Sequence, residues 1–105
     1  MNLTISARNF ELTDALTAYA GKKLNKLRRF SHHIIDGHLV LEKDKSISIV
    51  EISLLVKHST ITSKVKTNDI YQGINEIVKK AERQLQKYEE KFRERKRVAA
   101  KTKRI

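Results

Sequence analysis

Residues 47–66, ISIVEISLLVKHSTITSKVK, decide the fold. Val50, Ile52, Leu54 and Val56 recur at every second position, which is the period of a strand with one buried face. The same alternation continues over residues 60–66 after a short link at residues 58–59. A link of this length suits a hairpin, so the stretch predicts two antiparallel strands, at residues 47–57 and 60–66.

Two further strands are expected upstream of this hairpin. Residues 38–43 carry Leu39 and Leu41 on one face, and residues 44–46 are short enough to join them to the next strand as a meander. Residues 31–37, SHHIIDG, resemble a loop in composition, with Asp36-Gly37 as the turn signal. Near the N-terminus, residues 3–7 alternate as a half-buried strand.

Helical periodicity marks two other segments. Thr13 is a good N-cap for a first helix at residues 14–30, which has apolar residues such as Leu16 and Leu24 at helical spacing. A second helix, capped by Asn68 or Asp69, is expected to run to about residue 98 because the chain has no proline. Residues 99–105, AAKTKRI, are too polar and too short to pack, and are expected to form a basic, disordered tail.

An α+β fold would bury the apolar face of every predicted strand and helix. The element order is β-α-β-β-β-α, and the prediction is a four-stranded sheet with two helices packed on one face. A chain of 105 residues is one domain, here residues 1–98.

The charge is strongly positive and unevenly distributed. The chain has 23 Lys and Arg against 12 Asp and Glu, a net charge of +11. Residues 79–105 hold 12 of these basic residues and 4 acidic ones, so their net charge is 12 − 4 = +8. An anionic partner is therefore expected, and a net charge of this size favours a nucleic acid. The absence of cysteine excludes disulfides and thiol chemistry, and no apolar run or leader suggests a membrane or secretion, which favours the cytoplasm.

Basic residues form rows beside the apolar stripe of each predicted helix. Like charges four residues apart on a helix repel each other and destabilise an isolated helix. Two such rows in one small domain therefore favour an anionic partner over a merely solubilising surface. Few aromatic residues are free to stack on bases, which favours recognition of the backbone and shape of structured RNA. The predicted RNA-binding residues are Lys22, Lys23, Lys26, Arg29, Lys79, Lys80, Arg83, Lys87 and Lys91.

Catalytic and metal sites are not expected. No histidine pairs with another ligand residue at the spacing of a helical metal site. The pair His32-His33 in a loop is only a weak indication of a metal site, so ordinary exposed histidines are predicted. The three glycines form no phosphate-binding loop. The sequence therefore predicts no enzyme, no cofactor, no metal and no small-molecule substrate.

Two stretches resemble a known family. They are FELTDALTAYAGKKLNKL at residues 10–27 and NDIYQGINEIVKKAERQLQKYEEK at residues 68–91. Both resemble the ribosome hibernation promoting factor family, to which the ribosome-associated inhibitor protein Y also belongs. The similarity extends from residue 1 to about residue 95.

The resemblance implies a fold like that of double-stranded-RNA-binding domains and a site in the decoding channel of the small ribosomal subunit. There, members contact 16S rRNA and exclude mRNA and tRNA, which inactivates and preserves ribosomes under stress or in stationary phase. The protein is then expected to be a monomer off the ribosome. The resemblance extends an RNA-contact role to six of the predicted residues, Lys23, Lys26, Lys80, Arg83, Lys87 and Lys91.

Two departures bear on subtype. Long-form members have a second domain, for which this chain has no sequence, and protein Y has an acidic extension where residues 93–104 are strongly basic. The chain therefore resembles a short form, a class that brings ribosomes into dimers together with a separate modulation factor. The alternative function is a general structured-RNA adaptor or chaperone acting off the ribosome, and a weaker one is a small enzyme using the loop histidines.

Overall fold

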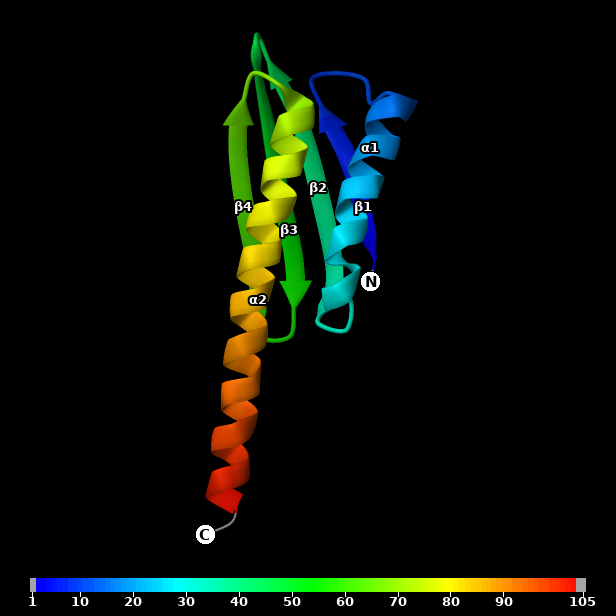
Figure 1. The fold of residues 1–105 in the computed structure, drawn as a ribbon. Helices are drawn as coiled ribbons and strands as arrows, with labels where there is room; N and C mark the ends of the chain where they lie inside the picture. The colour runs from blue at the N-terminus through cyan, green and yellow to red at the C-terminus, as the bar shows by residue number, and fades with distance from the viewer. Residues whose placement is uncertain (1, 104–105) are drawn as a thin grey trace.

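The computed structural model describes residues 2–103, with side chains described as far as Glu94. A four-stranded sheet carries both helices on one face (Figure 1), which confirms the predicted α+β class and element order. The elements are β1 (Leu3–Arg8), α1 (Asp14–Leu24), the 3-10 helix η1 (Asn25–Phe30), β2 (Ile34–Asp44), β3 (Ile47–Val56), β4 (Ser59–Thr67) and α2 (Ile70–Lys103).

The strands lie in the order β1-β2-β3-β4. β1 and β2 are parallel, so the chain must cross over between them, and α1 with η1 provides that crossover. β2, β3 and β4 form the predicted antiparallel meander. Its two tight turns include Lys45 and His58, whose positive φ angles of 58° and 67° place them in the left-handed region.

The core lies between the sheet and the helices. The inward side chains of β3, including Val50, Ile52 and Leu54, are completely buried, as the alternation predicts. They meet the apolar stripe of α2, in which Ile74 and Leu85 are also completely buried. The predicted helix and strand faces are therefore confirmed, and the basic rows lie on the outer sides of the same helices.

Three boundaries differ from the predictions. The first helix is α-helical only to Leu24, and residues 25–30 tighten into η1, which lets Leu27 and Phe30 stay buried. β2 begins at Ile34 inside the predicted loop, because Ile34 is buried and pairs with Val56 before a bulge. α2 extends to Lys103, past residue 98, since residues 99–103 contain no helix breaker. The helix thus contains residues 99–103 of the predicted tail, and residues 104–105 lie outside the part of the chain that the structure describes.

The other face of the sheet, here called the open sheet face, carries no helix (Figure 1). Lys64 and Lys66 project from it, because Val65 between them points into the core. In the part of the chain that the structure describes, no helix is both long enough and apolar enough to cross a bilayer.

Candidate RNA-binding surface

The helical face is the outer surface of α1, η1 and α2. At its start, Thr13 caps α1 as predicted, its Oγ1 accepting a hydrogen bond of 3.2 Å from the Leu16 backbone N–H. This helix and η1 position four of the predicted RNA-binding residues. Three are exposed and one is half-buried: Lys22, Lys26 and Arg29, with Lys23 in the intermediate class.

Two of these cations lie against aromatic rings. Lys23 Nζ is 5.4 Å from the centre of the Tyr19 ring, and Arg29 Cζ is 4.6 Å from that of Phe30. Contacts of this kind hold a long side chain close to the surface and leave its charge accessible. They therefore restrict where Lys23 and Arg29 present their charge.

α2 positions the remaining five predicted residues. Asp69 caps this helix, its Oδ1 accepting a hydrogen bond of 3.1 Å from the Tyr71 backbone N–H. Buried residues on the inner side fix the rotation of α2 over the sheet, which turns the basic row outward. Four members are exposed and one is half-buried: Lys79, Arg83, Lys87 and Lys91, with Lys80 in the intermediate class.

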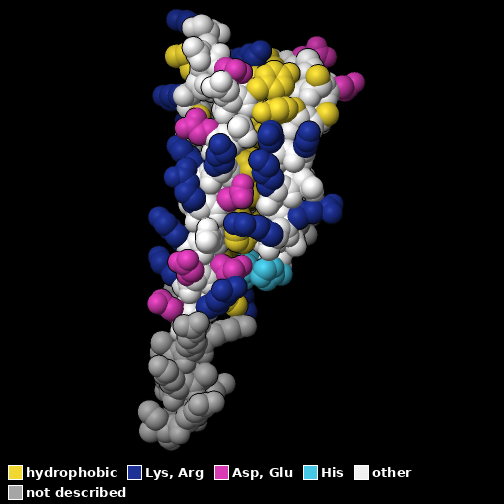
Figure 2. Space-filling model, viewed as in Figure 1, with side chains coloured by type: hydrophobic (Ala, Val, Ile, Leu, Met, Phe, Trp, Pro, Cys, Tyr) yellow, Lys and Arg dark blue, Asp and Glu magenta, His cyan; other side chains and the backbone are white. Residues whose placement is uncertain are grey.

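The two basic rows lie on one face but on different flanks. α1 and α2 lie side by side, with the Tyr19 and Tyr71 rings edge to face at 4.9 Å. Figure 2 shows Lys and Arg side chains spread across this helical face, with acidic side chains among them. The α2 row, however, reaches the side of α2 that faces the β3–β4 turn, because Lys87 and Lys91 line a groove there. All nine residues thus share one face without forming a single cluster.

This lysine groove has a volume of about 340 Å³ and lies between α2 and the β3–β4 turn. Lys57 joins Lys87 and Lys91 in its lining, together with the aromatic rings of Tyr88 and Phe92. Tyr88 Oη donates a hydrogen bond of 2.8 Å to the Lys57 carbonyl, which holds the two sides together. Lysines beside aromatic rings suit a nucleic-acid strand, whose phosphates and bases they can contact.

The RNA-binding residues predicted from the sequence do not include Lys57. Lys57 is predicted only as the last residue of a strand, and no local pattern links it to a helix far along the chain. Lys64 and Lys66, which are not among the predicted RNA-binding residues, lie on the open sheet face, away from the basic rows of the helices. Lys64 Nζ there lies 4.0 Å from Glu51 Oε2, an exposed contact of little energetic weight.

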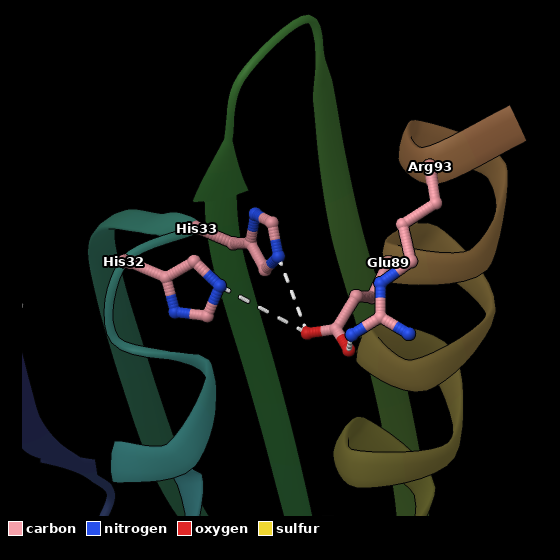
Figure 3. A network of polar contacts seen from close by, with 4 residues as sticks. All are labelled: His32, His33, Glu89 and Arg93. Atoms are coloured by element: carbon pink, nitrogen blue, oxygen red, sulfur yellow. Dashed lines mark hydrogen bonds and ion pairs between the residues drawn. The ribbon is translucent and has the colours of Figure 1, made fainter. Parts of the chain in front are cut away.

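A second polar cluster lies at the end of the helical face (Figure 3). His32 and His33 follow η1, and their Nε2 atoms lie 3.9 and 3.3 Å from Oε2 of Glu89 on α2. Arg93 holds the other carboxylate oxygen at 2.8 Å. The prediction of ordinary exposed histidines is wrong for His33, because only 8% of its side chain is accessible.

Comparison with known proteins identifies the family. Residues 3–93 match the model of the family described as Sigma 54 modulation protein / S30EA ribosomal protein. The chain belongs to this family. This match, together with relatives named ribosome hibernation promoting factor, confirms the predicted relationship.

Individual members of the S30EA family support the assignment. The chain is 31% identical over 91 residues to ribosome-associated factor Y of Haemophilus influenzae, covering 87% of this chain and 85% of that protein. It is 30% identical over 94 residues to the ribosome hibernation promoting factor of Klebsiella oxytoca, covering 90% and 99%. The match to the ribosome hibernation promotion factor of Bacillus subtilis, 33% identical over 102 residues, covers 90% of this chain but only 53% of that longer protein.

Solved structures of the S30EA family have the same fold. A ribosomal subunit interface protein from Coxiella burnetii superposes with a TM-score of 0.79 at 25% identity, covering 85% of this chain and 98% of that one. The N-terminal domain of Thermus thermophilus protein Y gives a TM-score of 0.76 at 27% identity, covering 84% and 99%.

Proposed function

We propose that this protein is a ribosome hibernation factor that binds the decoding channel of the small ribosomal subunit. In this proposal it occupies the path of mRNA and tRNA, and so inactivates ribosomes and preserves them under stress. It acts in the cytoplasm as a monomer until it meets the ribosome. We also propose that, as in other short forms, a separate modulation factor acts with this protein to bring ribosomes into dimers.

The cationic helical face is the observation that carries the proposal. Nine predicted RNA-binding residues lie on it, and Lys57 extends it into the lysine groove. Such a surface neutralises phosphates and releases their counterions, which supplies affinity without reading a base sequence. Relatives named for ribosome hibernation or for the ribosomal subunit interface support the ribosome as the partner of this surface.

The proposed inhibition is steric. An occupant of the channel excludes mRNA and tRNA by overlap, so it needs neither turnover nor a cofactor. This account differs from an enzyme that modifies or cleaves rRNA, because the inhibited ribosome should recover full activity once the protein is removed.

Competition on purified small subunits tests the proposal. Increasing initiator tRNA and mRNA together should displace the labelled protein, and increasing protein should release bound tRNA. Stable binding of both to one subunit would contradict the decoding-channel location. Failure to cosediment with ribosomes at low salt, combined with tight binding to free duplex RNA, would favour the alternative of a general RNA adaptor.

A further inference from the structure

The cluster at the end of the helical face contains three metal-ligand side chains. One ligand atom each from His32, His33 and Glu89 lies within 4.8 Å of the others. The histidines come from the loop between η1 and β2, and the glutamate comes from α2, so the fold alone brings them together (Figure 3). We propose that these three residues bind a divalent zinc-like cation and that the ion clamps the loop to α2.

The distances fit zinc coordination. Zinc bonds to imidazole nitrogen and carboxylate oxygen at about 2.0–2.2 Å, so neighbouring ligand atoms of a tetrahedral site stand about 3.3–3.6 Å apart. His33 Nε2 already lies 3.3 Å from Glu89 Oε2, and His32 Nε2 lies 3.9 Å from the same oxygen. The three ligand atoms lie within 4.8 Å of one another, so His32 must move closer to both other ligands, and its ring is free to do so because 65% of that side chain is accessible.

The buried nitrogen of His33 is the second, independent observation. Its side chain is more than nine-tenths buried, and Nε2 forms no hydrogen bond although Glu89 lies close by. Buried polar atoms in folded proteins nearly always have a hydrogen-bond partner, and the contact with Glu89 Oε2 at 3.3 Å does not provide one here. A cation between His33 and Glu89 supplies that partner and accepts the nitrogen lone pair.

Neighbouring groups hold the ligands in place. Tyr88 and Phe92 lie edge-on to the His33 ring, each with ring centres 5.4 Å away, which fixes the direction of Nε2. Arg93 Nη2 lies 2.8 Å from Glu89 Oε1, which leaves Oε2 directed at the histidines. Partners of this kind orient the ligands of known metal sites and strengthen binding.

The ligand set indicates the class of cation. Two imidazoles and one carboxylate suit zinc and its transition-metal neighbours, whereas magnesium and calcium prefer oxygen ligands. Three protein ligands leave a fourth position for water. Because the ligands come from two elements that are distant in sequence, the ion binds the folded state and stabilises it.

Titration of the tag-free, metal-stripped full chain with Zn²⁺ at neutral pH tests the proposal. We expect one equivalent of Zn²⁺ to bind and the thermal midpoint to rise, while Mg²⁺ at the same concentration has no effect. Glu89→Gln and His32→Ala should each weaken Zn²⁺ binding by at least about tenfold, since even partners outside the ligand shell contribute 10–100-fold. Co²⁺ in the same site should give a visible absorption band that both variants lose.

The control is His58→Asn, which removes a histidine at the β3–β4 turn and keeps a residue type that tolerates its positive φ. It should leave Zn²⁺ affinity unchanged. The proposal is overturned if micromolar Zn²⁺ does not bind, if Glu89→Gln binds as tightly as the parent, or if His58→Asn weakens binding as much as His32→Ala does. None of these readouts involves the ribosome, so the metal site stands or fails separately from the proposed function.

Discussion

Tyr88 Oη donates a hydrogen bond of 2.8 Å to the carbonyl oxygen of Lys57, and this bond ties α2 to the β3–β4 turn. The two residues belong to segments that are separate in sequence, and both line the lysine groove. The bond therefore helps to set the distance between Lys57 on one side of the groove and Lys87 and Lys91 on the other.

Tyr88→Phe removes this hydrogen bond and keeps the ring against His33. We expect the free energy of unfolding to fall by about 0.5–1.5 kcal/mol, the usual net value of one such bond. Urea unfolding measures it. The control is Tyr71→Phe, because the Tyr71 hydroxyl has no hydrogen bond among the described residues, and an equal loss in both variants would contradict the assigned role.

Two helical glycines should respond oppositely to alanine. A Cβ at Gly73 would lie 2.8 Å from Thr67 Cγ2 and 2.9 Å from Val50 Cγ2, so α2 approaches the sheet too closely for a methyl group. Gly73→Ala should destabilise the protein by about 1–3 kcal/mol. Gly21→Ala meets nothing within 4 Å and should stabilise α1 by up to about 1 kcal/mol.

Thermal or urea unfolding of the two variants compares them directly. The same substitution in two helices of one protein controls for helix propensity. A stabilised Gly73→Ala variant would contradict the close approach of α2 to β3.

The C-terminal basic segment should add affinity for RNA without adding stability to the core. Residues 95–105 contain six Lys and Arg and no acid. Truncation after Glu94 keeps Phe92 against His33, so the unfolding transition should be unchanged, whereas ribosome binding should weaken and its salt dependence should decrease.

A full-length variant with those six residues changed to Gln separates charge from chain length. It should bind as weakly as the truncated protein. If it binds like the parent, the contribution of the segment is not electrostatic.

Local pattern was sufficient for most of the fold. Alternation predicts the buried faces of β3 and β4, and the Thr13 cap places the start of α1. The start of β2 could not be predicted in this way, because residues 31–37 have the composition of a loop. Ile34 becomes part of a strand through its pairing with Val56 on β3, which is a tertiary contact.

The candidate sites show the same limit. Helical spacing places the basic rows on the outer sides of the helices, because each row depends only on its own helix. The lysine groove and the His33–Glu89 contact each join segments that are far apart in sequence. No spacing rule connects such residues, so they become visible only in the fold.

The central claim is that the helical face, and not the open sheet face, contacts ribosomal RNA. The most direct test is the salt dependence of binding to small subunits for two charge-matched double variants, Arg83→Ala/Lys87→Ala on α2 and Lys64→Ala/Lys66→Ala on β4. Each removes two positive charges. The account predicts that the α2 variant binds more weakly and that its logarithmic salt slope falls by about 1.4–1.8, since each phosphate contact contributes roughly 0.7–0.9, while the β4 variant stays close to the parent. A loss in the β4 variant equal to or greater than that in the α2 variant would contradict the claim.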